Sequence, residues 1–261
     1  MNQPSDNHQG TPTSDNTSFG NYPAPTPAPQ RARIEMPQAA PYVTYAIIGI
    51  TILAYLLQAT PYGNAFVEAF IKSNDQIRAG EFWRLLTPAL LHANLMHIGF
   101  NMYALLSFGT GLERHFGHGR FFMLYVLGAF AGNVMSFLMT NADSLGASTA
   151  IFGLVGAEAI FLVKNRKLFA GQFRSAIGNI IFIVIINLVV IGSLANVDNW
   201  GHIGGLVGGL MFSWFASPIW QIEGIAPVLH LVDQRPTREV LTGAATVILV
   251  FGALAMWGMI K

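Results

Sequence analysis

Two residues of this chain, Ser148 and His202, could together perform nucleophilic catalysis. A serine hydroxyl becomes a nucleophile when a base takes its proton, and histidine is the usual base because it titrates near neutral pH. Each residue lies at the start of a long apolar run, so we expect both at a similar depth in the molecule. The acidic residues Asp143 and Asp198 lie in connecting segments, which favours a Ser–His dyad over a triad.

Further polar and small residues accompany this pair. A helix that begins near the serine would present free backbone N–H groups and the positive end of its dipole, which suit a developing oxyanion. His97 and Asn101 share one face of a predicted helix and can supply side-chain donors. Gly205 and Gly209 follow the histidine on its own helical face, where they would let another helix approach closely.

Each of these residues has an alternative interpretation when it is considered alone. A serine inside an apolar helix usually bonds to its own helix or fills a helix contact, and Ser148 could do the same. An isolated histidine could be a proton relay, a haem or metal ligand, or a structural hydrogen-bond donor. A transporter or haem-binding protein that uses His92, His97 and His202 is therefore one alternative, although the chain shows no internal repeat of the transporter type.

The elements that must position these residues are strongly apolar. The chain has 261 residues, of which 52% are hydrophobic and 10% charged, whereas a typical soluble domain has about 25% charged residues. Because the apolar runs do not alternate in polarity, helices rather than strands are expected, and several runs approach the ~20 residues that cross a bilayer. The predicted fold class is all-α, a polytopic membrane helix bundle. The seven predicted spans are residues 43–60, 92–111, 119–140, 148–164, 175–194, 201–217 and 240–259.

Three regions are predicted along the chain. Residues 1–41 are rich in Asn, Pro, Ser, Thr and Gln and are expected to form a disordered polar cytoplasmic tail. Residues 42–217 hold six predicted helices, with a connection at 61–91 whose apolar side chains indicate a structured external loop of short amphipathic helices. Residues 218–261 hold a cytoplasmic connection and a seventh transmembrane helix.

The distribution of basic residues predicts the orientation. With seven spans, ten of the 14 Lys and Arg residues lie on the side of the N-terminus and four on the other side. Cytoplasmic connections carry the excess of Lys and Arg, so we expect a cytoplasmic N-terminus and an external C-terminus. The net charge of +1 gives no sign of a nucleic-acid partner, and the absence of Cys excludes a thiol nucleophile. No targeting segment is recognisable, which favours a bacterial cytoplasmic membrane.

Taken in order, these motifs resemble the rhomboid family of intramembrane serine proteases. The resemblance covers about Phe82 to Ser217. It implies a six-helix rhomboid core followed here by one C-terminal transmembrane helix, a known variation of the family. The matching residues are Trp83-Arg84, His92, His97 and Asn101 in the pattern His-x4-His-x3-Asn, Gly109, Glu113 and Gly117 in the pattern Gly-x3-Glu-x3-Gly, Gly146-x-Ser148, and His202 with Gly205 and Gly209.

The resemblance implies a role for each polar residue of the site. Ser148 would be the nucleophile and His202 the general base, while His97, Asn101 and the backbone N–H of Ser148 would form the oxyanion hole. The substrates would be transmembrane proteins with a single helix in the lipid bilayer, cut near its external end. No metal or other cofactor is expected, and the oligomeric state stays open. A catalytically weak or inactive rhomboid-like protein that binds transmembrane clients is the alternative, although such relatives typically lack the serine or the histidine.

Other positions would support the site by the same resemblance. Gly146, Gly205 and Gly209 would be structural, and Phe152 stands where the family often has a Tyr stacked under the catalytic His. Thr149 departs from the family, which usually has Gly after the nucleophile, and its branched side chain could reshape the pocket beside the oxyanion. The fifth run and the loop at 195–200 would form a gate and a cap.

Overall fold

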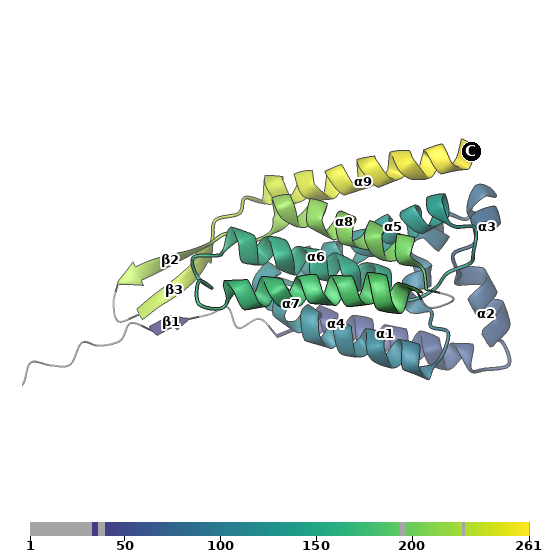
Figure 1. Ribbon diagram of the computed structural model, residues 1–261, viewed down its shortest axis with the longest axis horizontal. Coiled ribbons are helices and arrows are strands. Elements are labelled where there is room, and N and C mark those ends of the chain that lie inside the picture. The colour runs from purple at the N-terminus through teal and green to yellow at the C-terminus, as the bar shows by residue number, and fades with distance from the viewer. Residues whose placement is uncertain (1–32, 36–39, 194–196, 226–227, 261) are drawn as a thin grey trace, which may run out of the picture.

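The computed structural model describes residues 33–35, 40–193, 197–225 and 228–260 (Figure 1). The helices are α1 (Tyr42–Gln58), α2 (Gly63–Phe70), α3 (Asn74–Arg78), α4 (Leu95–Phe116), α5 (His118–Met139), α6 (Ser148–Lys164), α7 (Phe173–Ile185), α8 (Asn199–Ala216) and α9 (Thr237–Ile260). Short turns of other helix types are η1 (Phe82–Leu85), η2 (Thr87–Leu90) and η4 (Ile191–Ser193), which are 3-10 helical, and η3 (Ile186–Val190), which is π-helical. The strands are β1 (Arg33–Glu35), β2 (Trp220–Ile225) and β3 (Val228–Asp233).

The long helices coincide with the apolar runs of the sequence. Each predicted run overlaps one of the described helices α1, α4, α5, α6, α7, α8 and α9. Within the described residues, α5, α9 and the stretch Phe173–Ser193, which continues α7 through η3 and η4, are the three helical segments long and apolar enough to cross a membrane; α1 is apolar but shorter. The prediction of a mainly helical, apolar bundle is therefore confirmed.

A small sheet corrects the all-α prediction. β2 and β3 pair antiparallel, β1 pairs parallel with β3, and the order is β1-β3-β2. β2 and β3 lie in the segment that we expected to be a plain connection, and β1 lies within the tail predicted to be disordered; apart from Ala40 and Pro41, the rest of that tail falls outside the described residues. Strands this short give a weak periodic signal beside long apolar runs, and the pairing of Arg33 with Val228 joins distant parts of the chain.

The core of the bundle lies where α5, α6 and α8 pack together. Leu124, Leu154 and Phe212, one from each helix, are completely inaccessible to solvent. The outer stretch Phe173–Ser193 behaves differently, because only 6% of its most apolar window is buried inside the protein, against 67% for α5. The helices that carry Ser148 and His202 are thus packed in the core, whereas α7 lies at the edge with most of its surface outside the protein interior.

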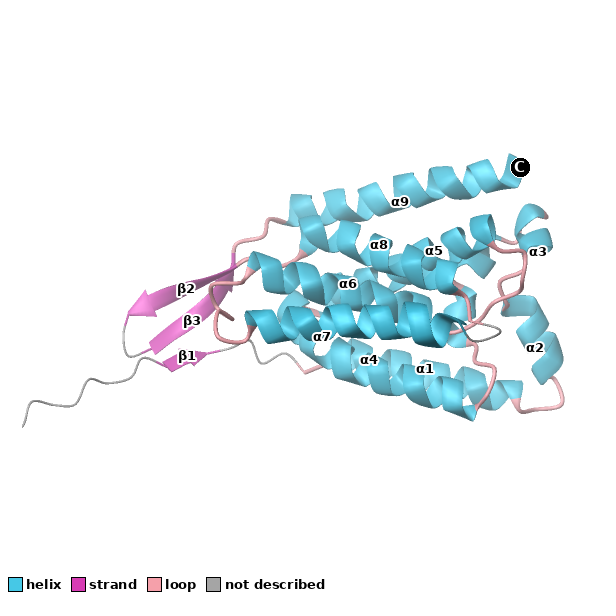
Figure 2. Cartoon of the chain, viewed as in Figure 1, coloured by secondary structure: helices cyan, strands magenta, loops and turns pink. Residues whose placement is uncertain are grey.

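The connection between α1 and α4 is built from short helices rather than a free loop. Trp83 donates its indole N–H to the carbonyl of Ala69 at 3.1 Å, and the buried Arg84 donates to the carbonyls of Glu68 at 2.6 Å and Ile71 at 2.9 Å. These bonds fasten η1 to the end of α2. Figures 1 and 2 show α2 and α3 at one end of the bundle and the sheet at the opposite end.

The Gly-x3-Glu-x3-Gly motif joins α4 to α1. Glu113 is completely buried, and its carboxylate accepts hydrogen bonds from the backbone N–H groups of Val43 at 2.8 Å and Thr44 at 2.7 Å. These donors belong to the first turn of α1, where backbone N–H groups have no partner within the helix. A Cβ at Gly109 would lie 3.0 Å from the Thr44 side chain, so this motif holds two helices together at close range.

Candidate active site

The structure brings Ser148 and His202 into direct contact. Ser148 is the first residue of α6, and His202 lies in the first turn of α8. The Nε2 atom of His202 is 2.9 Å from the Oγ atom of Ser148. That distance fits a hydrogen bond in which the serine hydroxyl donates to the unprotonated ring nitrogen. Two residues 54 positions apart in the sequence therefore form one unit.

The aromatic ring of Phe152 stacks on the imidazole of His202. The ring of Phe152 lies parallel to it, with the centroids 4.4 Å apart and an angle of 8° between the planes. Within the described part of the chain, the buried Nδ1 atom of His202 has no hydrogen-bond partner. The described geometry is therefore that of a dyad, with Phe152 one turn along α6 from Ser148 and under the base.

Gly146 allows His97 to reach the serine. Its backbone has a φ of +137°, a conformation that residues with a side chain rarely adopt. A Cβ at this position would lie 2.8 Å from Nε2 of His97 and 3.6 Å from Oγ of Ser148. The imidazole of His97 thus lies against the chain just before Ser148, in space that only glycine leaves open.

The start of α4 holds the remaining polar residues of the predicted site. Asn94 caps the helix, since its side chain accepts the backbone N–H of His97 at 2.9 Å. The buried His92 packs edge-on against the ring of His97, with the centroids 5.0 Å apart. Asn101 is also buried, and its amide donates to the carbonyl of His97 at 3.0 Å. The structure thus places His97 beside the serine, whereas the described hydrogen bond of Asn101 is to its own helix.

The N-terminus of α6 offers donors for an anion. The residue before it, Ala147, makes no side-chain cap, and its carbonyl accepts the N–H of Ile151. The N–H groups of Ser148, Thr149 and Ala150 therefore have no partner inside the helix, and the positive end of its dipole adds to them. A negatively charged oxygen bound beside Ser148 would meet these donors.

Thr149 packs between helices. A Cβ built on Gly132 in α5 would lie 2.5 Å from Cβ of Thr149, and one built on Gly201 in α8 would lie 3.1 Å from its Cγ2. The side chain therefore points toward α5 and α8, into room that Gly132 and Gly201 leave. Sequence reasoning missed Gly132, because nothing local pairs a glycine of one helix with a threonine of another.

Asn199 joins the edge helix to the start of α8. Its amide donates to the carbonyls of Leu188 at 3.1 Å and Gly192 at 3.0 Å, in the π-helical and 3-10 turns that follow α7. The i to i+5 pattern of a π-helix disturbs the regular backbone ladder, which makes carbonyls available to such a donor. The sequence placed Asn199 in the predicted cap at 195–200 but did not indicate these hydrogen bonds, because a π-helical turn has no clear sequence signature.

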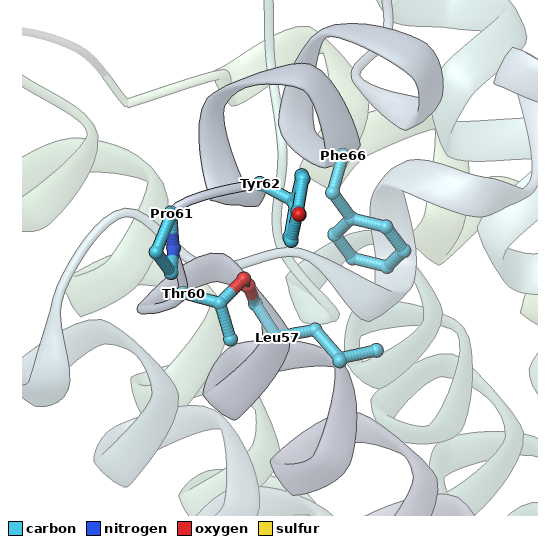
Figure 3. A pocket seen from close by; sticks show the side chains of 5 residues that line it. All are labelled: Leu57, Thr60, Pro61, Tyr62 and Phe66. Atoms are coloured by element: carbon cyan, nitrogen blue, oxygen red, sulfur yellow. Dashed lines mark hydrogen bonds between the residues drawn. The ribbon is translucent and has the colours of Figure 1, made fainter.

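Two cavities among the described residues lie away from Ser148 and His202. An apolar groove of about 880 Å³ runs between α9, α5 and the segment around η1. Neither this groove nor the pocket of Figure 3 is lined by Ser148 or His202, and the described residues contain no group of three or more His, Asp or Glu that could hold a metal ion. The pocket of Figure 3, of about 370 Å³ at the turn from α1 to α2, is lined by Leu57, Thr60, Pro61, Tyr62 and Phe66.

Comparison with known proteins agrees with these motifs. The family model of the Rhomboid domain matches residues 79–219, which is more than half of the chain. Rhomboid protease GluP of Bacillus subtilis (strain 168) is 43% identical over 173 residues, covering 65% of this chain and 34% of that protein. RHOMBOID-like protein 9, chloroplastic, of Arabidopsis thaliana is 32% identical over 152 residues, which cover 58% of this chain and 35% of that protein. Rhomboid-like protease 1 of Toxoplasma gondii is 28% identical over 206 residues, 70% of each chain.

The matched segment contains every residue of the candidate site from His92 to Gly209. The chain spans about a third of the length of the first two relatives. Because the family model covers more than half of the chain and the described helices are apolar, this chain belongs to the rhomboid family and is a multi-pass membrane protein.

Proposed function

We propose that the protein is an intramembrane serine endopeptidase that cleaves single-pass transmembrane helices near their external end. The contact of 2.9 Å between Nε2 of His202 and Oγ of Ser148 is the observation that carries this proposal. His202 would accept the hydroxyl proton as Oγ attacks the scissile carbonyl carbon, and would pass it to the leaving amine as the peptide bond breaks. His202 would then activate a water molecule that hydrolyses the acyl-enzyme ester and releases Ser148.

The proposed oxyanion hole combines one backbone donor and two side chains. The free N–H of Ser148 lies at the positive end of α6, and the imidazole of His97 lies against Gly146 beside it. Asn101 would contribute through the second N–H of its amide, since the bond to the carbonyl of His97 uses one of the two. Such donors stabilise the charge that develops on the carbonyl oxygen during attack.

We expect His97→Ala to lower kcat by about 10²–10³-fold, the usual cost of losing one oxyanion donor, and Asn101→Ala to have a similar or smaller effect. KM should change little, because the donors bind the oxygen mainly in the transition state. Steady-state cleavage of a transmembrane substrate measures both quantities. His230→Ala is the matched control, since this exposed histidine lies in β3. Wild-type kcat in His97→Ala would rule out the imidazole as a donor.

The membrane arrangement follows the charge distribution. In our proposal residues 42–217 form a six-helix rhomboid core and α9 adds a seventh span, with the sheet in the cytoplasm of a bacterial cell and Ser148 near the external face. A helical substrate hides its peptide bonds in its own hydrogen bonds, so it would have to unwind before attack. The peripheral helix α7, little of which is buried, is the element proposed to move aside as a gate, with the loop at 195–200 as its cap. The bonds from Asn199 would hold this gate to α8.

We expect a reporter fused after Lys261 to be external, and a reporter inserted between β2 and β3 to be cytoplasmic. The excess of basic residues on the side of the N-terminus is the physical reason. Protease protection of both fusions in right-side-out vesicles is the measurement, with lysed vesicles as the control. A protected reporter after Lys261 would overturn the proposed topology.

Cleavage of a model substrate tests the function itself. The full chain, purified and reconstituted into lipid vesicles with a single-pass transmembrane protein, should cut that protein near the external end of its helix. Mass spectrometry of the two products would locate the cut. Small residues at the cut and helix-weakening residues such as Gly nearby should favour cleavage, since Gly destabilises a helix most among residues other than Pro. A folded protein that binds the helix but never cuts it would instead be a client-binding rhomboid-like protein.

A further inference from the structure

Lys72 is a buried lysine to which the proposed reaction gives no role. It lies between α2 and α3, outside the spanning helices, and its side chain is completely inaccessible to solvent. Lysine is almost never fully buried unless its charge is paired, because removing an ammonium group from water is costly. Its Nζ atom donates to the carbonyls of Thr140 at 3.0 Å and Ala142 at 2.8 Å.

These two carbonyls belong to the connection between α5 and α6, which leads directly into Ser148. The backbone of Lys72 also pairs with this connection in both directions, because its N–H donates to the carbonyl of Ser144 at 3.1 Å and its carbonyl accepts the N–H of Ser144 at 3.2 Å. Nearby, the amide of Asn74 donates to the carbonyl of Thr140 at 3.0 Å. The segment before the candidate nucleophile is therefore anchored to the segment around Lys72.

The ammonium group of Lys72 also interacts electrostatically with Asp198, at the start of the helix that carries His202. Asp198 caps α8, since its Oδ1 accepts the N–H of Gly201 at 2.9 Å. Its other oxygen, Oδ2, is buried and has no hydrogen-bond partner among the described residues. Burial lowers the pKa of Lys72 to about 8, although the negative charges of Asp198 and Asp143 act to raise it; the positive charge of Arg78 lowers it further. The positive charge of Lys72 thus attracts the residue that caps α8, although the described residues form no direct ion pair between Lys72 and Asp198.

We propose that Lys72 is a positioning residue that holds both halves of the dyad in register. Its ammonium group fixes the connection that ends at Ser148 and, through Asp198, the N-terminus of the helix that bears His202. This role rests on the proposed protease function, because register between the two residues matters only if they react together. A shift of about 1 Å between reacting groups can lower a rate by about 10²-fold.

The pH dependence of this arrangement has a definite sign. Below about pH 8 Lys72 is charged in the folded protein, and above it the amine keeps two donors but loses the charge that attracts Asp198. The pKa of the folded state lies below the ordinary value of 10.5, so the cost of burying the charge disappears as the pH rises between these values. The contribution of Lys72 to the free energy of unfolding therefore rises with pH. Over the same range its positioning of Ser148 and His202 becomes weaker. An anchor that acted only on stability would not lower activity in this range.

The test measures kcat/KM of the reconstituted full chain between about pH 7 and about pH 10, since this ratio reports groups that titrate in the free enzyme. The wild type should show an alkaline loss with an apparent pKa of about 8. Lys72→Arg should move that loss to higher pH, because guanidinium stays charged. Lys72→Met should lower kcat/KM at neutral pH by up to about 10²-fold and should show no alkaline loss of kcat/KM. Lys167→Met, an exposed lysine after α6, is the control.

Hydrogen exchange of the backbone supplies a second readout that needs no activity. Amides of residues 142–147 and 199–201 should exchange faster in Lys72→Met than in the wild type or in Lys167→Met. The role of Lys72 would be overturned if the wild type is active and Lys72→Met keeps the same kcat/KM, the same alkaline loss of kcat/KM and the same rates of amide exchange. If the wild type is inactive but the backbone amides of Lys72→Met still exchange faster than those of the wild type, the proposed function is overturned while the structural role of Lys72 stands. If Lys72→Met does not fold, Lys72→Arg provides the test. An alkaline loss of kcat/KM at higher pH than in the wild type supports the role of Lys72, and an unchanged loss overturns it.

Discussion

Replacing Ser148 by Ala is expected to abolish cleavage of a transmembrane substrate, lowering kcat by about 10⁴–10⁶-fold while the bundle stays folded. The substitution removes only the Oγ atom that lies 2.9 Å from His202, and alanine is a good residue for the first turn of α6. His202→Ala should lose a comparable factor, because a serine without its base stays protonated. The double variant should be no worse than either single variant, since two groups that act as one unit are not additive.

Three measurements separate loss of chemistry from loss of structure. Cleavage rates give the change in kcat, thermal unfolding monitors the fold, and a fluorophosphonate reagent should label Ser148 in the wild type but not in Ser148→Ala. Ser107→Ala is the matched control, because this exposed serine of α4 bonds only to the carbonyl of Tyr103 in the described structure. A Ser148→Ala or His202→Ala variant that cleaves at the normal rate would show that the dyad assignment is wrong.

The second large effect is expected at a residue that performs no chemistry. A Cβ at Gly205 would lie 2.0 Å from the carbonyl oxygen and 2.8 Å from the carbonyl carbon of Thr149. Both are backbone atoms that no rotamer change can move, so Gly205→Ala must push α8 away from α6. Overpacking of this kind costs about 1–3 kcal/mol in the free energy of unfolding. Because α6 and α8 carry the two halves of the dyad, kcat should also fall by about 10²-fold.

Thermal unfolding and kcat of Gly205→Ala measure the two effects. Gly111→Ala in α4 is the control, because a Cβ there meets nothing within 4 Å, and alanine at an open helix position should be neutral or stabilise by about 0.5–1 kcal/mol. Gly209→Ala offers a second instance of the clash, since its Cβ would lie 2.1 Å from the carbonyl oxygen of Gly153. If Gly205→Ala keeps the melting temperature and kcat of the wild type, α6 and α8 are not in close contact at this position.

Much of the fold could be predicted from the sequence because long apolar helices are a local property of the chain. A run of apolar residues must satisfy its backbone hydrogen bonds within itself, so composition and length are enough to place α1 and α4 to α9. The sheet was missed because its strands are short and because the pairing of β1 with β3 depends on segments far apart in the sequence. The sequence predicted short helices before α4 but not their positions, since many apolar residues in a connection do not specify where each turn begins.

The sequence by itself selected Ser148 and His202, and also His97 and Asn101, because the residue types of a motif and their spacing can be read directly from the sequence. Only the tertiary structure decided that the two dyad residues meet at 2.9 Å, that Phe152 stacks on the imidazole, and that Lys72 reaches the segment before the serine. Each of these contacts joins different elements of the fold. Their distances depend on how closely the helices pack, and that closeness is set by glycines and backbone atoms on different helices, which no single stretch of sequence reveals.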